Sequence, residues 1–211
     1  MPCPTKRIHF GSFCFDITDE VYEPAEDSFL FAENLVVAAD ELVLDLGTGC
    51  GVLAVLAAKK GGCVIAADIN PFAIRCAKAN AQLNRVGEKI DFLQADLFTA
   101  LSDGVGFDLV LFNAPYLPSE EDETTSWIGR SWAGGKDGRQ VVDLFISYVP
   151  AYLKPKGKVL LMQSTLTGVE ETIRGFVQQN FKAQVIAERK LPFFETLTLI
   201  EAKRQRNKEM L

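Results

Sequence analysis

Histidine is almost absent from this sequence, and the few cysteines are widely spaced. His9 is the only histidine, and the five cysteines form no C-x-x-C pair. Structural zinc and iron–sulfur sites take their ligands from closely spaced residues of these two types, so the sequence argues against a metal site built by this chain. An odd number of thiols with no visible secretory signal is typical of reduced proteins, and we expect a cytoplasmic chain.

Long apolar runs and an excess of basic charge are also missing. The longest apolar runs, such as residues 35–39, fall far short of the roughly 20 residues of a membrane-spanning helix. We therefore expect no membrane association. The net charge of −6 argues against a main affinity for nucleic-acid phosphates. The local exception is the basic stretch 203–211, which we expect to be a solvated tail.

What the sequence does contain is an alternation of strand and helix patterns over its 211 residues. Residues 7–22 look extended, and a helix is expected to begin near Pro24 with Leu30, Phe31, Leu35 and Val36 buried. Seven strands are predicted beyond it, at residues 42–46, 63–67, 90–93, 107–113, 159–162, 183–187 and 196–202. Helical patterns lie between them at 52–60, 72–83, 139–153 and 169–179.

This alternation predicts an α/β fold, with a seven-stranded, mostly parallel sheet and helices on both faces. The last strand is expected to be antiparallel because its connection, residues 188–195, is short. No linker is visible. We expect one domain over residues 1–211, with residues 1–40 forming an N-terminal extension and the first helix.

The first of these strands runs directly into the glycine turn Gly47-Thr48-Gly49-Cys50-Gly51. A strand, a glycine turn and a helix together cradle nucleotides, because the turn leaves backbone amides free at the helix N-terminus. Asp68 follows the next strand, about 20 residues later, where an acid can accept bonds from two ribose hydroxyls. Asp96 follows the third strand. A glycine turn alone is a weak signal, since many nucleotide-binding proteins share it.

The fourth strand ends at Asn113-Ala114-Pro115-Tyr116. Alone, this tetrapeptide fits an ordinary proline turn as well as a ligand-binding rim. Two other stretches favour the rim. Tyr22–Ser28 carries a tyrosine and three acids, more than a helix cap requires. Residues 117–138 form a long loop with two tryptophans, and such loops are usually functional unless they are disordered.

The spacing of Asp45, the turn glycines, Asp68 and Asp96 resembles that of the class I S-adenosylmethionine-dependent methyltransferases, which have a Rossmann-like fold. The resemblance implies S-adenosyl-L-methionine as cofactor, with the turn at its methionine part, Asp68 at the ribose, and Asp96 and Leu97 at the adenine. The residues expected to bind the cofactor are Glu26, Ser28, Asp45, Gly47, Thr48, Gly49, Gly51, Asp68, Ile69, Asp96, Leu97 and Asn113.

Asn113-Ala114-Pro115-Tyr116 resembles the (Asp/Asn)-Pro-Pro-(Tyr/Phe) motif of amino-methylating enzymes. An amide nitrogen is a poor nucleophile because its lone pair is delocalised. The Asn113 side-chain oxygen and the Ala114 carbonyl could hold its two N–H groups, with Tyr116 packed against the amide plane. These four residues are the predicted catalytic set, and Asn113, Tyr116 and Trp132 are expected to bind the substrate. The motif usually has proline where this chain has Ala114, so a stiffening ring is lost while the carbonyl remains.

Together with Tyr22–Ser28 and Trp132–Arg139, this motif resembles the release-factor glutamine methyltransferases, in their short archaeal and eukaryotic branch. The resemblance implies that the substrate is the Gly-Gly-Gln loop of a class I peptide-chain release factor. It also implies a small zinc-binding activator subunit as partner. The strand at 90–93 is a candidate edge for that subunit, although ordinary burial explains its apolar residues equally well.

Two other functions remain open at this point. The same motif serves N6-adenine methylation of DNA or RNA, which the acidic charge and the absence of an added recognition domain disfavour. A cofactor-binding module with weak catalysis is the alternative from another class, and Ala114 would be its symptom.

Overall fold

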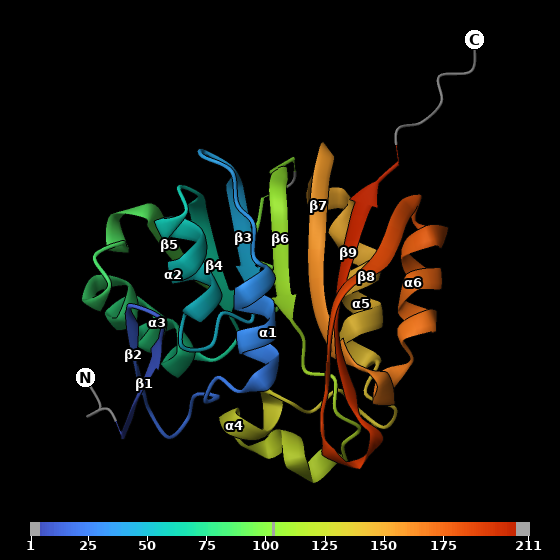
Figure 1. Cartoon of the computed structure of the whole chain (residues 1–211), viewed down its shortest axis with the longest axis horizontal. Coiled ribbons are helices and arrows are strands. Elements are labelled where there is room, and N and C mark those ends of the chain that lie inside the picture. The colour runs from blue at the N-terminus through green and yellow to red at the C-terminus, as the bar shows by residue number, and fades with distance from the viewer. Residues whose placement is uncertain (1–4, 103, 206–211) are drawn as a thin grey trace.

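The centre of the molecule is a seven-stranded sheet, seen in a computed structural model that describes residues 5–102 and 104–205. The strand order across the sheet is β5-β4-β3-β6-β7-β9-β8 (Figure 1). The strands, in chain order, are β3 (Leu42–Leu46), β4 (Cys63–Asp68), β5 (Ile90–Gln94), β6 (Phe107–Asn113), β7 (Leu153–Ser164), β8 (Phe181–Lys190) and β9 (Thr196–Arg204).

All neighbouring pairs are parallel except those made by β9, which runs antiparallel to both β7 and β8. The predicted fold class and the antiparallel last strand are therefore confirmed. The short connection from β8 cannot cross back over the sheet, so β9 must reverse direction. The carboxyl ends of β3, β4, β5, β6, β7 and β8 all lie at one edge of the sheet, which is the lower edge in Figure 1.

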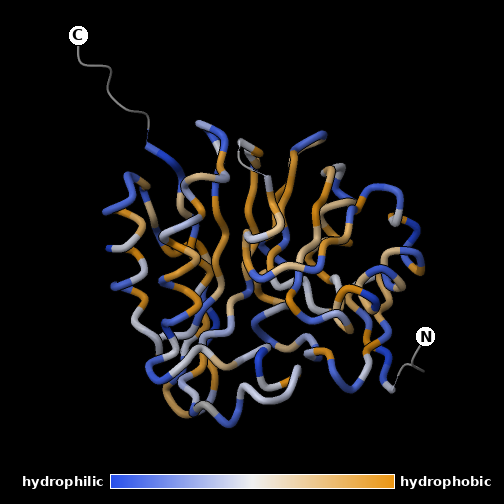
Figure 2. The backbone as a smooth tube through the Cα atoms, turned by 180° about the vertical axis from the view of Figure 1, so that it is seen from behind, coloured by the Kyte–Doolittle hydropathy of each residue, from blue (hydrophilic) through white to orange (hydrophobic). Residues whose placement is uncertain are grey.

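Helices cover both faces of the sheet. On one face pack α1 (Glu26–Asn34), α2 (Val52–Lys59) and α3 (Pro71–Leu83), and on the other α5 (Gln140–Tyr148) and α6 (Val169–Gln178). Successive residues of the central strands, such as Val43 and Leu44, enter the two opposite core layers. Because both faces are buried, these strands are continuously apolar rather than alternating, and they form the hydrophobic centre of Figure 2.

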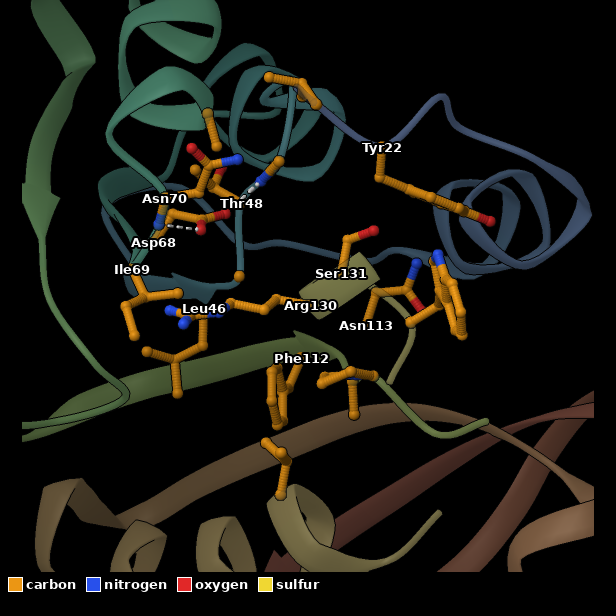
Figure 3. A pocket seen from close by; sticks show the side chains of 18 of the residues that line it. Tyr22, Leu46, Thr48, Asp68, Ile69, Asn70, Phe112, Asn113, Arg130 and Ser131 are labelled. Carbon is orange, nitrogen blue, oxygen red and sulfur yellow. Dashed lines mark hydrogen bonds between the residues drawn. The ribbon is translucent and has the colours of Figure 1, made fainter. Parts of the chain in front are cut away.

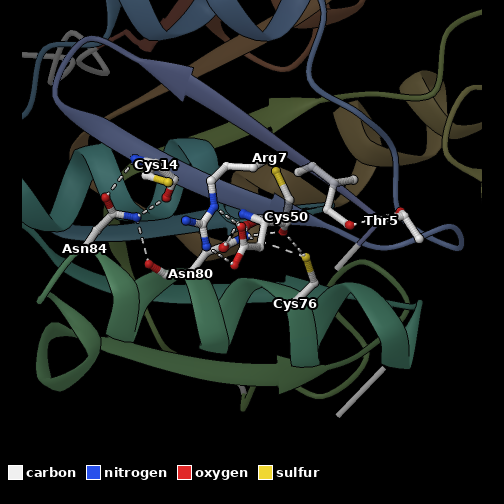
Figure 4. A network of polar contacts seen from close by, with 9 residues as sticks. Thr5, Arg7, Cys14, Cys50, Cys76, Asn80 and Asn84 are labelled. Atoms are coloured by element: carbon white, nitrogen blue, oxygen red, sulfur yellow. Dashed lines mark hydrogen bonds and ion pairs between the residues drawn. The ribbon is translucent and has the colours of Figure 1, made fainter. Parts of the chain in front are cut away.

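An N-terminal hairpin, β1 (Lys6–Phe10) and β2 (Phe13–Ile17), packs against α3. Asn80 and Asn84, one turn apart on α3, each make paired hydrogen bonds to the backbone of β2 (Figure 4). Asn80 bonds the N–H and C=O of Asp16 at 2.8 and 2.9 Å, and Asn84 bonds those of Cys14 at 3.1 and 2.7 Å. The two side-chain amides thus pair with the β2 backbone as a neighbouring strand would, which holds the hairpin against α3.

Several sequence expectations are corrected here. Val36 is 68% exposed, because α1 ends at Asn34 and the chain turns outward, whereas Leu30, Phe31 and Leu35 are buried as predicted. The loop 117–138 contains a 3₁₀ turn at Glu121–Thr125 and the short helix α4 (Trp127–Arg130). The expected tail begins later, since Lys203 and Arg204 belong to β9; residues 206–211 lie outside the described residues. Within the described ranges, no helix has both the length and the apolar character to span a membrane.

Candidate active site

A cavity of about 630 Å³ opens at the carboxyl edge of the sheet, between the start of α1 and the segment 117–133. That volume is typical of a small-molecule site. Most of the residues predicted from the sequence line it: Ser28, Asp45, Gly47, Thr48, Gly49, Asp68, Ile69, Asp96, Leu97, Asn113, Ala114, Pro115, Tyr116 and Trp132. Figure 3 shows Thr48, Asp68 and Ile69 on one side of the cavity and Asn113 with Tyr22 on the other.

The glycine turn is fastened to the strand ends by two carboxylates. Asp45, at 1% exposure, accepts a hydrogen bond from the Thr48 hydroxyl at 2.6 Å. Burial raises the pKa of Asp45 to about 7, with the charge of Asp68 adding to the effect and the bond from Thr48 opposing it. Its second oxygen, Oδ1, is buried and makes no hydrogen bond of standard geometry, although the Ala54 backbone is close enough to oppose the rise of the pKa. A buried orphan acceptor beside a cavity is a place for a ligand donor.

Asp68 holds the turn from the neighbouring strand. Its carboxylate accepts from the Gly49 N–H at 2.9 Å and from the Asn70 N–H at 2.8 Å. Burial raises the pKa of Asp68, and these backbone bonds oppose the rise. Asn70 in turn caps α3 by accepting from the Phe72 N–H at 2.8 Å. The end of β4, the glycine turn and the start of α3 are thereby one connected unit.

Two predicted cofactor residues, Glu26 and Gly51, are not among the lining residues in the described ranges. Gly51 has φ of 89° at the start of α2, and a Cβ there would lie 3.0 Å from the Cβ of Ala77. Its absent side chain therefore serves the packing of α2 against α3, as the third glycine of such turns does elsewhere. Glu26 opens α1, and its backbone carbonyl accepts from Arg189 at 3.4 Å.

Asn113 is held in one orientation by α1. Its Nδ2 donates to Asp27 Oδ2 at 3.0 Å and to the Ser28 hydroxyl at 3.2 Å. The opposite orientation would set the amide oxygen against a carboxylate, so the network itself determines which end faces which way. Asn113 Oδ1 is consequently left buried without a partner on a side chain that lines the cavity.

Asp27 is the functional residue that sequence reasoning missed. It is 6% exposed and accepts from the Tyr22 hydroxyl at 3.2 Å and the Ser28 N–H at 2.6 Å. Burial, followed by the charge of Asp27, raises the pKa of both Tyr22 and Tyr116. The excess of acids after Tyr22 was the available signal. This signal identified the correct turn of the helix, but the residue predicted from it was Glu26, which directly precedes Asp27.

The segment 117–133 forms a cover over the cavity. The Leu117 N–H donates to the Trp132 carbonyl at 2.9 Å, and the Gly134 N–H donates to the Leu117 carbonyl at 2.8 Å. Gly138 packs beneath Tyr116, since a Cβ on it would lie 2.3 Å from the Tyr116 carbonyl oxygen. Arg130 stacks on Trp127 and bonds the Thr124 carbonyl at 2.8 Å. In Figure 3 the guanidinium of Arg130 points toward Leu46 and Ile69.

Comparison with known proteins identifies the family. A model of the methyltransferase small domain matches residues 11–129. A putative protein N5-glutamine methyltransferase of Methanocaldococcus jannaschii is 46% identical over 182 residues, covering 85% of this chain and 90% of the relative. This chain belongs to that methyltransferase family. Methyltransferase HEMK2 of Homo sapiens is 36% identical over 177 residues, covering 79% of this chain and 80% of the relative.

A solved structure supports the fold assignment of this methyltransferase. The E. cuniculi Mtq2-Trm112 complex, described as responsible for methylation of the eRF1 translation termination factor, matches with a TM-score of 0.66. The match covers 88% of this chain and 99% of the other. Because the sequence identity is 24%, the match supports the fold alone. The resemblance seen in the sequence motifs is confirmed by these comparisons taken together.

The cofactor of this methyltransferase is S-adenosyl-L-methionine, and the cavity suits it. The ligand carries positive charge on its sulfonium and ammonium groups, and four carboxylates, those of Asp27, Asp45, Asp68 and Asp96, line the cavity. Carboxylates stabilise such charge most strongly where water is excluded. Asp45, with its buried Oδ1, and the glycine turn line the same cavity.

Proposed function

We propose that this enzyme methylates the side-chain amide nitrogen of the glutamine in the Gly-Gly-Gln motif of a class I peptide-chain release factor. The observation that carries the proposal is the oriented Asn113 amide, whose Oδ1 is buried, lacks a partner and belongs to a cavity-lining residue. The names of the relatives support it, because one is described as acting on glutamine N5 and another on a translation termination factor.

The cofactor occupies the half of the cavity formed by β3, β4 and the end of β5. Asp68 would accept from the ribose hydroxyls, Ile69, Asp96 and Leu97 would line the adenine site, and the turn Gly47–Gly49 would hold the methionine part. Asp45 faces the ammonium group with its orphan oxygen. When bound, S-adenosyl-L-methionine supplies an electrophilic methyl group on sulfur. Ser28 helps to orient Asn113 by accepting a hydrogen bond from its side chain. Gly51 allows α2 to pack closely against α3.

The glutamine amide occupies the other half, at Asn113–Tyr116. Asn113 Oδ1 and the Ala114 carbonyl accept the two N–H groups, which points the nitrogen lone pair away from the protein and toward the methyl donor. Tyr116 and Trp132 pack against the planar amide. Positioning of this kind supplies much of the rate in a reaction without a strong base. As the bond from the methyl group to sulfur breaks, its electron pair stays on sulfur, and the methylated nitrogen releases its surplus proton to water because an N-protonated amide is strongly acidic.

The proposal includes a small zinc-binding activator subunit that pairs with β5. This strand is at the end of the sheet order, with β4 as its partner on one side. An open strand edge can be extended by a strand of another protein. Co-expression with such a subunit should raise solubility and activity together. The proposal also places the enzyme in the cytoplasm with its translation substrate, which agrees with the free thiols at Cys14, Cys50, Cys63 and Cys76.

The deciding experiment incubates the enzyme, with and without a candidate activator, with labelled cofactor and either release factor or DNA. Mass spectrometry then maps the methyl group. One methyl on the glutamine of Gly-Gly-Gln is the expected result, and a Gln→Glu release factor is the matched control that should stay unmodified. Label on DNA alone would establish the N6-adenine activity instead, and cofactor binding without transfer to any substrate would establish the binding module.

A further inference from the structure

The hairpin tip between β8 and β9 exposes two adjacent phenylalanines. Phe193 is 95% exposed and Phe194 103% exposed, the highest values among the exposed large hydrophobic residues of the described chain. Neither ring therefore contributes to the core. A contiguous apolar group held in water on a folded protein marks a place where another molecule binds.

The tip is held in a defined position. The Leu191 N–H donates to the Glu195 carbonyl at 2.8 Å, which closes the turn. The Arg189 guanidinium pairs with Glu33 of α1 at 2.7 Å, which fastens the end of β8 to the body of the enzyme. The backbone φ angles of Phe193 and Phe194 are 62° and 67°. Residues other than glycine and asparagine rarely adopt this left-handed conformation. Strained backbone of this kind concentrates at binding sites.

The tip lies at the same rim as the active site. β8 runs in the same direction as β6 and β7, so its carboxyl end reaches the edge where the cavity opens. Figure 1 shows the β8–β9 turn extending to the level of α4 at that edge. The Thr196 N–H donates to the Thr165 hydroxyl at 3.0 Å, next to Leu166, which is 55% exposed. Glu195 is close enough for its charge to raise the pKa of Tyr116.

We propose that Phe193, Phe194 and Leu166, named here the rim patch, bind the folded substrate protein beside its reactive glutamine. This inference rests on the proposed function and extends it from the amide to the surrounding surface. The hairpin that carries Phe193 and Phe194 lies near Tyr116, since the charge of its Glu195 acts on that side chain. Glu195 follows the two phenylalanines on the hairpin, so the surface expected on the partner is apolar with a lysine or arginine beside it.

The test compares the wild-type enzyme with a Phe193→Ser/Phe194→Ser double variant on two substrates. One substrate is the intact release factor, and the other is a short peptide that carries the glutamine and a few neighbours. We expect KM for the release factor to rise at least tenfold, while kcat, the KM for the peptide and cofactor affinity stay within about twofold. Tyr148→Ser is the matched control, since Tyr148 is 52% exposed at the far end of α5 and should change none of these values.

Each other outcome overturns the inference. An unchanged KM for the release factor would show that the rim patch does not bind it, and equal losses on both substrates would indicate damage to the cavity. A change from dimer to monomer in sedimentation, with KM unchanged, would assign the rim patch to a second copy of this chain. Failure of the wild-type enzyme to methylate the release factor would instead refute the proposed function, so the two failures are distinguishable.

Discussion

The two halves of the cavity are built in different ways. On the side proposed for the cofactor, the main contacts join residues close in the sequence, such as Gly49 with Asp68, 19 residues apart. On the side proposed for the substrate, Asn113 is oriented by Asp27, 86 residues away, and the cover completes the lining. In a parallel sheet, the carboxyl ends of neighbouring strands and the residues that follow them lie side by side as a result of strand pairing alone. The other half depends on one buried polar network that joins α1 to β6.

The two halves also differ in what they leave unsatisfied. Each contains one buried oxygen without a partner, the carboxyl Oδ1 of Asp45 in the half proposed for the cofactor and the amide Oδ1 of Asn113 in the half proposed for the substrate. A carboxylate suits a cation and an amide oxygen suits a neutral N–H. The chemistry of each orphan oxygen therefore matches the ligand proposed for its half.

Replacing Asn113 with alanine should produce the largest difference between the effect on methyl transfer and the effect on cofactor binding. We expect kcat to fall by a factor on the order of 10²–10³, the typical cost of removing one positioned hydrogen-bonding group from an active site. Cofactor affinity should change little, because the contacts of the other half are untouched. Methyl-transfer kinetics and calorimetric titration with cofactor measure the two quantities. A parallel loss of cofactor affinity would contradict the assigned role.

Asp27→Asn should reduce kcat by about 100-fold, because a misplacement of roughly 1 Å at a reacting group costs that much. Asn113 Nδ2 and the Tyr22 hydroxyl now donate hydrogen bonds to the Asp27 carboxylate. An asparagine at this position would turn N–H groups toward these donors, and the Asn113 amide would lose its orientation. KM for the cofactor should stay constant. Glu26→Gln is the matched control, since this neighbouring acid lies outside the lining, and its kcat should remain at the wild-type value.

Asp68→Ala tests the cofactor half. Loss of a bidentate acceptor should weaken cofactor binding by about 2 kcal/mol, which is roughly 30-fold in Kd. At saturating cofactor, kcat should recover to near the wild-type value. Equilibrium dialysis with labelled cofactor measures the first effect, and initial rates measure the second. Unchanged affinity would refute the ribose assignment.

The smallest expected effect is a pH dependence from Asp45. Its pKa of about 7 in the folded protein lies above the ordinary carboxyl value of 3.8. A cationic ligand favours the ionised form, so cofactor affinity should rise about tenfold from pH 6 to pH 8. Because the folded state binds this proton more tightly than the unfolded state, the protonated form of Asp45 stabilises the free enzyme. Its free energy of unfolding should therefore decrease as pH rises from about 4 through 7. Asp45→Asn should flatten both profiles, as titration calorimetry and urea unfolding would show.

Local patterns predicted most of the sheet and its helices. Apolar runs placed β3 and β6, the short connection 188–195 predicted the reversal of β9, and Asp45 and Asp68 were expected at strand ends and lie there. Errors fell where periodicity was weak or a choice between neighbours depended on distant contacts. Val36 lies beyond the end of its helix, and Asp27, not Glu26, faces Asn113.

The sequence by itself determined the fold class, the glycine turn, the strand-end acids and the tetrapeptide at 113–116. These follow from apolar periodicity and from turn chemistry, which act over a few residues. Only the tertiary structure decided which acid of α1 orients the Asn113 amide, which oxygens are left without partners, and that Phe193 and Phe194 lie at the carboxyl edge of the sheet. The packing of α1 against β6 and the direction of β8 decide these points, and both depend on contacts between residues far apart in the chain.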